Sequence, residues 1–175
     1  MPHIGPHVTL DQPAYIHDTA QLHGKVYVGP GASIWTYAVT RSELYEIRIG
    51  ARTNIQDFVM IHEGHGSPTI IGEDCSITHH VILHGCRIGD RCLIGINATV
   101  MDGAVIGNNC IVAGNAIVSE GSEFPDNSVI GGVPAKILTT RDNSEANLAN
   151  AAFYGQLAEQ YAKGNDRLDP SDFPV

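Results

Sequence analysis

The sequence predicts an all-β solenoid, a parallel β-helix that is followed by a C-terminal α-helix. Two observations predict it: an aliphatic residue recurs every six residues over most of the chain, and the repeat gives way near the end to an alanine-rich stretch. Three six-residue steps close one coil of a three-sided solenoid and raise the chain by one inter-strand spacing, about 4.8 Å. The repeating positions are Ile16, Leu22, Val28, Ile34, Ile49, Ile55, Ile61, Ile71, Ile77, Leu83, Ile88, Ile94, Val100, Ile106, Val112, Val118, Phe124 and Ile130.

Each six-residue unit is expected to form one short strand and one corner. The aliphatic residue points inside, and a small residue four positions later, such as Ala20 or Ala98, fits where the chain turns. Three of the four cysteines occupy this corner position, so we expect buried, reduced thiols that act as small apolar residues. These three are Cys75, Cys92 and Cys110. The same interpretation is extended to Cys86, which lies outside the corner position.

The repeat is predicted to end at Leu138, which divides the chain into a solenoid (1–138) and a C-terminal part (139–175). Residues 139–143 are expected to form a linker, and Ser144–Lys163 a helix that Gly164 ends. The tail from Asn165 onward, with Pro170 and Pro174, is expected to be extended and peripheral. One stripe of the helix is predicted to lie along the outside of the solenoid: Asn147, Asn150, Tyr154, Leu157 and Tyr161.

The charge balance disfavours nucleic acid as a partner. The chain has 10 Lys and Arg residues against 19 Asp and Glu residues, a net charge of −9, and no basic patch stands out. No apolar run reaches the roughly 18 residues that a membrane span needs, so no membrane association is expected. The N-terminus does not resemble a secretory signal, and the expected location is the cytoplasm.

Nine histidines precede residue 85, and the repeat places two of them together. His62 directly follows Ile61, and His84 directly follows Leu83. The step from Ile61 to Ile71 is four residues longer than the others, and without that insertion the two histidines are one coil apart. Their Cα atoms should then lie roughly 5 Å apart. Two imidazoles at that spacing can share one metal ion with metal–nitrogen bonds of about 2.0–2.1 Å.

The same counting places His79 on the neighbouring face, where it cannot easily reach a metal held by His62 and His84 of its own chain. A second copy docked face to face could supply its own His79. One coil lower, Arg41 should lie beneath His62 and Asp57 beneath His79. The docking that unites the three histidines would therefore also pair Arg41 with Asp57 across the interface.

Several segments resemble the γ-class carbonic anhydrases. The resemblance covers roughly residues 10–138 and implies a left-handed hexapeptide-repeat β-helix that assembles as a homotrimer with three interfacial metal sites. His62 and His84 of one subunit and His79 of the next would hold the metal. The segments that resemble the family are Arg41–Glu43, Asn54–Asp57, Val59–His62, His79–Cys86 and Ile94–Ala104.

The resemblance implies hydration of carbon dioxide to bicarbonate by a metal-bound hydroxide. By position, Gln56 would orient the metal-bound water or hydroxide, and Asn54 would line the carbon dioxide side of the pocket. Arg41 and Asp57 would form the inter-subunit ion pair. Three neutral imidazoles suit Zn²⁺, and Fe²⁺ or Co²⁺ would also fit.

Two departures from the family pattern concern the surroundings of the site. Arg41–Ser42–Glu43 stands where the family commonly has Arg-Gly-Asp, so the carboxylate is one methylene longer. The long acidic loop that supplies a proton-shuttling glutamate in the archetypal enzyme is replaced by the short segment Glu63–Pro68. His65 or Glu63 could assist proton export instead, and the expected turnover is modest.

Two functions from other classes remain as alternatives. Coenzyme-A-dependent acyltransferases form the other large group of hexapeptide-repeat trimers, but they use one histidine as a general base, so three ligands in register would be superfluous. A metal-binding trimeric scaffold with little catalysis would keep the ligands without the proton pathway.

Overall fold

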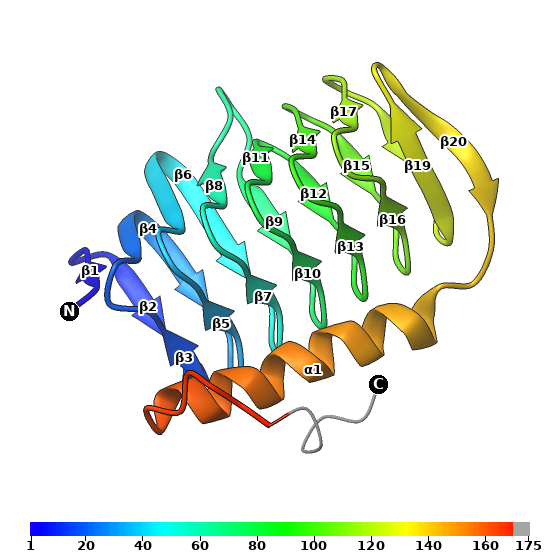
Figure 1. Ribbon diagram of the computed structural model, residues 1–175. Coiled ribbons are helices and arrows are strands. Elements are labelled where there is room, and N and C mark those ends of the chain that lie inside the picture. The colour runs from blue at the N-terminus through cyan, green and yellow to red at the C-terminus, as the bar shows by residue number, and fades with distance from the viewer. Residues whose placement is uncertain (170–175) are drawn as a thin grey trace.

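The computed structural model describes residues 1–169, which form a parallel β-solenoid of about seven turns with one C-terminal helix. The predicted fold class is confirmed. Figure 1 shows the coils stacked in chain order from β1 to β19, with the helix α1 (Ser144–Ala162) running along one side of the stack. The expectation for the tail at Pro170 and Pro174 lies outside the described residues.

The short strands stack into three flat faces, which follow one another around each coil. The first face contains β1 (His3–Ile4), the first halves of β4 (Gln21–Val28) and β6 (Val39–Ile49), β8 (Met60–His62), β11 (Ile82–His84), β14 (Thr99–Val100) and β17 (Ile117–Val118). The second face contains β2 (Val8–Leu10), the second halves of β4 and β6, β9 (Thr69–Ile71), β12 (Arg87–Ile88), β15 (Val105–Ile106) and β18 (Glu123–Phe124). The third face contains β3 (Tyr15–Ile16), β5 (Ser33–Ile34), β7 (Asn54–Ile55), β10 (Ser76–Ile77), β13 (Leu93–Ile94), β16 (Ile111–Val112), β19 (Ser128–Gly132) and β20 (Ala135–Thr140).

The core lies between the three faces and is made by the six-residue repeat. Every repeating aliphatic position is buried except Ile16, which is partly buried and packs against the core. The four cysteines are buried and unpaired, as predicted. Where the repeat breaks, Thr40 takes an inward position in register with Ile61. The arithmetic of the repeat therefore predicts the core correctly.

The corners require a backbone conformation that most residues avoid. At the corner that leads from the third face to the first, Tyr37, Phe58 and His80 have φ values of 57°, 61° and 60°. The left-handed region costs such residues roughly 1–2 kcal/mol relative to glycine. Their rings stack, with centroids 5.3 Å apart for Tyr37–Phe58 and 4.8 Å apart for Phe58–His80.

The nine-residue step from Thr40 to Ile49 is accommodated by a bend inside β6. The register between β4 and β6 shifts between Gly24 and Val26, where β6 has the extra residues. Gly24 has φ +82°, and a Cβ atom there would lie 1.6 Å from the Ser42 carbonyl oxygen. Only glycine allows this close approach, and the bend then projects residues 43–45 beside the first face.

The C-terminal boundaries differ slightly from the prediction. Strand β20 pairs antiparallel with β19 and continues to Thr140, so it takes up the first two residues of the expected linker. The helix ends at Ala162, one residue before the predicted end, and Gly164 follows with φ +83°. Asn143 precedes the helix but does not cap it, because its side chain donates to the carbonyls of Asn109 and Arg141.

The predicted helix stripe lies against the third face. Asn147 is buried, and its amide donates to the carbonyls of Arg91 (2.8 Å) and Cys110 (3.1 Å). Tyr154 and Tyr161 pack edge-on against Trp35, with ring centroids 5.6 and 5.0 Å apart. Within residues 1–169, no helix has the length and apolar character needed to cross a membrane.

Candidate metal centre

His62 and His84 lie side by side at the corner between the first and second faces. They are in register on β8 and β11, as the repeat predicts. His62 Nδ1 and His84 Nε2 are 3.0 Å apart, and the ring centroids are 4.9 Å apart. Two nitrogens that bind one tetrahedral ion at about 2.0–2.1 Å are separated by about 3.3 Å. The two rings are therefore already spaced for a shared ion and need only a small adjustment.

A carboxylate contacts one ring nitrogen of each candidate ligand. Glu43 Oε2 lies 3.2 Å from His62 Nε2, and Asp102 Oδ1 lies 2.7 Å from His84 Nδ1. Asp57 Oδ2 lies 3.0 Å from His79 Nδ1. Within residues 1–169 these are the only histidine–carboxylate pairs. Metal-binding histidines usually donate their second nitrogen to such a partner, which leaves the first nitrogen free for the ion.

The third histidine lies on the other edge of the first face. His79 follows β10 and is in register above Asp57, which follows β7, so this part of the register prediction is confirmed. The one group of three ligand-type side chains with donor atoms within 4.8 Å, in the part of the chain described, is Glu43, His62 and Glu63. His79 is not in it. Its role as a ligand therefore stays a prediction that requires a second subunit.

Glu63 serves the bend in β6 rather than a metal. Its buried carboxylate accepts hydrogen bonds from the Ser42 hydroxyl and from the backbone N–H groups of Glu43, Leu44 and Tyr45. Burial alone would raise the pKa of Glu63, but these donors hold the pKa below its usual value. Because four donors use the lone pairs of this carboxylate, it has no free position for an ion or for accepting a proton.

Arg41 lies directly beneath His62 in the stack, as predicted. Within the chain it forms an ion pair with Glu43, and this guanidinium is the main reason that the pKa of Glu43 lies below its usual value. Arg41 and Asp57 lie on opposite edges of the first face, one coil below His62 and His79. Their pairing across an interface remains a prediction.

Asn54 and Gln56 are brought together on the third face, next to the helix. Gln56 Nε2 donates to Asn54 Oδ1 at 2.9 Å, and Asn54 Nδ2 donates to Ser76 Oγ at 3.0 Å. Ser76 Oγ in turn donates to Asn150 Oδ1 at 2.8 Å. The side chains of Asn54 and Gln56 are almost fully buried in the single chain. This series of hydrogen bonds connects the Gln56 side chain to the helix and holds its orientation. The predicted roles of Gln56 and Asn54 at the metal stay predictions.

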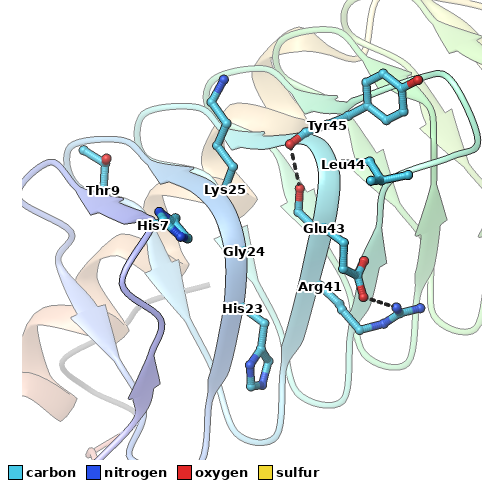
Figure 2. Close-up of a pocket in the computed structure, with 10 residues that line it drawn as sticks. His7, Thr9, His23, Gly24, Lys25, Arg41, Glu43, Leu44 and Tyr45 are labelled. Carbon is cyan, nitrogen blue, oxygen red and sulfur yellow. Dashed lines mark hydrogen bonds and ion pairs between the residues drawn. The ribbon is translucent and has the colours of Figure 1, made fainter.

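A cavity of about 870 Å³ adjoins the centre on the side of the first coils. Figure 2 shows Arg41 and Glu43 side by side along one wall, Leu44 and Tyr45 at the bend above them, and His7 and His23 on the opposite wall. The cavity is not lined by His62, His79 or His84. It meets the candidate metal centre only through Arg41 and Glu43.

The first face and its corner with the third face expose apolar side chains near the two halves of the site. They include residues of the turn columns as well as outward residues of the strands. The most exposed are Tyr37, Phe58, Ile82, Ile96 and Ile117, each 41–53% exposed in the single chain. An apolar strip of this kind is typical of a protein–protein contact surface.

Two contacts of the site were missed by the sequence reasoning. Asp102 lies one residue beyond Met101, the position in register above His84, because the step from Leu83 to Ile88 has five residues instead of six; counting the repeat therefore did not find it. The contact between Glu43 and His62 depends on the bend in β6, and no periodicity predicts the path of an insertion.

Known proteins resemble the chain in sequence and in fold. The family model described as bacterial transferase hexapeptide (six repeats) matches residues 85–120. "Gamma carbonic anhydrase 3, mitochondrial" of Arabidopsis thaliana is 46% identical over 173 residues, which cover 94% of this chain and 67% of that protein. The chain spans about half to two thirds of the length of the curated relatives it matches.

Solved structures of two bacterial proteins share the fold. A hexapeptide transferase family protein from Anaplasma phagocytophilum superposes with a TM-score of 0.83 at 30% identity, covering 88% of this chain and 92% of that one. A Bacillus cereus protein described as a putative acetyltransferase gives a TM-score of 0.80 at 30% identity, covering 91% of each chain.

Proposed function

Because the chain belongs to the γ-class carbonic anhydrase family, we propose that it hydrates carbon dioxide to bicarbonate at metal centres between the subunits of a homotrimer. One observation supports this most strongly. The repeat predicts His62, His79 and His84 as ligands, and in the described residues each of these three histidines has one ring nitrogen in contact with a carboxylate. Carbon dioxide and water give bicarbonate and one proton, so the site must activate water and release the proton.

The donor set fits a divalent metal ion. His62 and His84 direct nitrogens toward one point, and the carboxylate partner of each ring contacts the other ring nitrogen, which fixes the orientation of the ring. Zn²⁺ is the proposed ion, and Fe²⁺ or Co²⁺ would suit the same ligands. When bound, such an ion lowers the pKa of a coordinated water to about 7, which supplies a nucleophile at neutral pH.

The remaining residues orient the reactants and move the proton. Gln56, fixed through Asn54, would orient the attacking water, and Asn54 would border the carbon dioxide side. Glu63 is committed to the bend, so exposed His65 is the better candidate for carrying the proton to solvent. Arg41 and Asp57 would set the register of the two subunits.

The trimer is proposed because one chain holds the two halves of the site on opposite edges of one face. His62 and His84 lie at the far end of β8 and β11, and His79 lies at the corner before β11. Ile82, an outward residue of the exposed apolar strip, lies between them on β11. The four buried, unpaired cysteines suit a reducing compartment, and the cytoplasm is the proposed location.

Mixed trimers test the shared site directly. We would prepare metal-free His79→Ala and His84→Ala chains, dissociate and reassemble them as a one-to-one mixture, and measure bound zinc and carbon dioxide hydration. Each variant alone should bind little metal. In the mixture, about a quarter of the interfaces should join an intact His62/His84 edge to an intact His79, as random filling of a closed ring requires. Metal and activity should return in that proportion.

The matched control is a mixture of His62→Ala and His84→Ala chains, which damage the same edge and cannot complement each other. Recovery in this control, or none in the first mixture, would contradict the shared site. Hydration that is absent from a fully metallated wild-type trimer would contradict the proposed activity and favour the scaffold.

Acyl transfer is the second candidate function, because a solved structure with this fold is described as a putative acetyltransferase. That chemistry would need one histidine as general base and would not need three metal ligands. The discriminating measurement is consumption of acetyl-coenzyme A by the metal-free protein with amine and alcohol acceptors. Turnover that persists in the His62→Ala/His84→Ala double variant would favour acyl transfer.

A further inference from the structure

We infer that Asp102 is a positioning residue that holds His84 in the one tautomer able to present Nε2 to the metal. The inference rests on the proposed function and deepens it, because it assigns a residue that neither the repeat nor the family resemblance singled out. It concerns a residue that acts through His84 and does not itself touch the metal or the substrate.

Asp102 belongs to the coil above His84. The Gly103 N–H donates to the Gly85 carbonyl at 2.8 Å, which sets Asp102 over the corner that follows β11. From there Asp102 Oδ1 reaches His84 Nδ1 at 2.7 Å, the shortest of the three histidine–carboxylate contacts. Both side chains are about one-third exposed, so the contact lies at the edge of the site.

Two glycines make room for this carboxylate. A Cβ atom at Gly64 would lie 2.0 Å from Asp102 Oδ1, and one at Gly85 would lie 2.2 Å from it. Gly64 belongs to the short insertion after His62, and Ser67 Oγ donates to the Gly85 carbonyl at 3.1 Å, which ties that insertion to the same corner. The insertion and the corner at Gly85 thus enclose the position of one carboxylate oxygen.

The contact selects a tautomer by simple hydrogen-bond chemistry. A carboxylate only accepts, so His84 Nδ1 must carry the hydrogen, and Nε2 keeps its lone pair. That Nε2 atom is the one that faces His62 Nδ1 at 3.0 Å. In the opposite tautomer the hydrogen on Nε2 would occupy the direction in which a metal ion must approach.

The first measurement is the dissociation constant of Co²⁺ and Zn²⁺ for Asp102→Asn and Gly64→Ala trimers, by competition with a chelator. Loss of an outer carboxylate typically weakens metal binding about 10–100-fold, and we expect that range for both variants. Gly64→Ala keeps the Asp102 and His84 side chains, and the backbone at Gly64 is not left-handed. The added Cβ atom would crowd the Asp102 carboxylate at 2.0 Å and the Ser67 hydroxyl at 2.6 Å, so it should displace the carboxylate. Asp90→Asn is the matched control: Asp90 has the same place in its repeat, but it accepts from the Glu73 N–H and contacts no histidine.

The second measurement is independent of metal. Nitrogen-15 NMR of the histidine rings in the metal-free protein should show His84 protonated at Nδ1 in the wild type and in Asp90→Asn. In Asp102→Asn, the hydrogen of the neutral His84 ring should move toward Nε2. Sedimentation should show that this variant is still a trimer. An unchanged tautomer or an unchanged dissociation constant in Asp102→Asn would overturn the inference. A wild type that binds no metal would overturn the proposed function, and the tautomer alone would then decide whether Asp102 positions His84.

Discussion

At the scale of single residues, proton export is the step for which the chain offers the fewest groups. Glu63 is held by four donors, whereas His65 is exposed in the same insertion. We predict that His65→Ala lowers carbon dioxide hydration at low buffer concentration and has little effect in concentrated imidazole buffer, which can carry the proton itself. Stopped-flow hydration across a buffer series would measure this. His3→Ala, an exposed histidine of the first coil, is the control, and equal loss in both variants would argue against a shuttle at His65.

The second prediction at this scale concerns the bend that Glu63 stabilises. Glu63→Gln replaces an acceptor-only carboxylate with an amide whose NH₂ group would face backbone N–H groups. We expect the free energy of unfolding to fall by about 1–3 kcal/mol, the usual cost of leaving buried partners unsatisfied. Chemical denaturation at fixed chain concentration would measure it. The exposed Glu120→Gln should stay within about 0.5 kcal/mol of wild type, and similar stability of both variants would show that the bend does not need the charge.

At the scale of elements, the helix is attached by polar contacts as much as by apolar ones. Asn147 satisfies two carbonyls of neighbouring coils, Arg91 and Cys110, from a buried position. Asn147→Ala should lower the free energy of unfolding by about 1–3 kcal/mol. Exposed Asn165, which bonds only to Gln160 nearby, provides the control variant Asn165→Ala. Equal melting temperatures for the two variants would contradict a role for Asn147 in docking the helix.

The sequence predicts most of this architecture because one residue in six must point inward, and a shift of one residue would expose the whole set. The same period predicts that His62 lies next to His84, and Asp57 beneath His79, in neighbouring coils. It fails where the chain leaves the repeat. The bend that brings Glu43 to His62, and the antiparallel return of β20 to Thr140, depend on close contacts such as Gly24 against Ser42. Periodicity does not encode such contacts.

At the scale of the whole molecule, the apolar strip should hold the assembly together. Ile82 points outward from β11, between His79 and His84, and is 43% exposed in the single chain. Ile82→Asp should dissociate the trimer, because association would bury a charge without a partner. Sedimentation at micromolar concentration would show this. Leu148 is similarly exposed on the helix, and Leu148→Asp should leave the trimer intact. A monomeric or dimeric wild type would contradict the assembly itself.

The ion pair proposed between subunits gives a further prediction. Arg41→Ala and Asp57→Ala should each weaken the trimer by about 2–5 kcal/mol if the partner charge is left buried. The double variant should be less destabilised than the sum of the two, because the two residues share one contact. Trimer dissociation constants for the four proteins would measure the coupling. Additive effects would show that Arg41 acts only through its own Glu43 and Asp57 only through its own His79.

The placement of unlike halves of one site on the two edges of a single face limits how copies of the chain can join. Each contact is head-to-tail, so any open chain of subunits leaves one unused half at each end. A pair of subunits would contain one complete centre rather than two, whereas a closed ring contains as many centres as subunits. Activity per chain should therefore depend on protein concentration, and dilution would lower it before any individual chain unfolds.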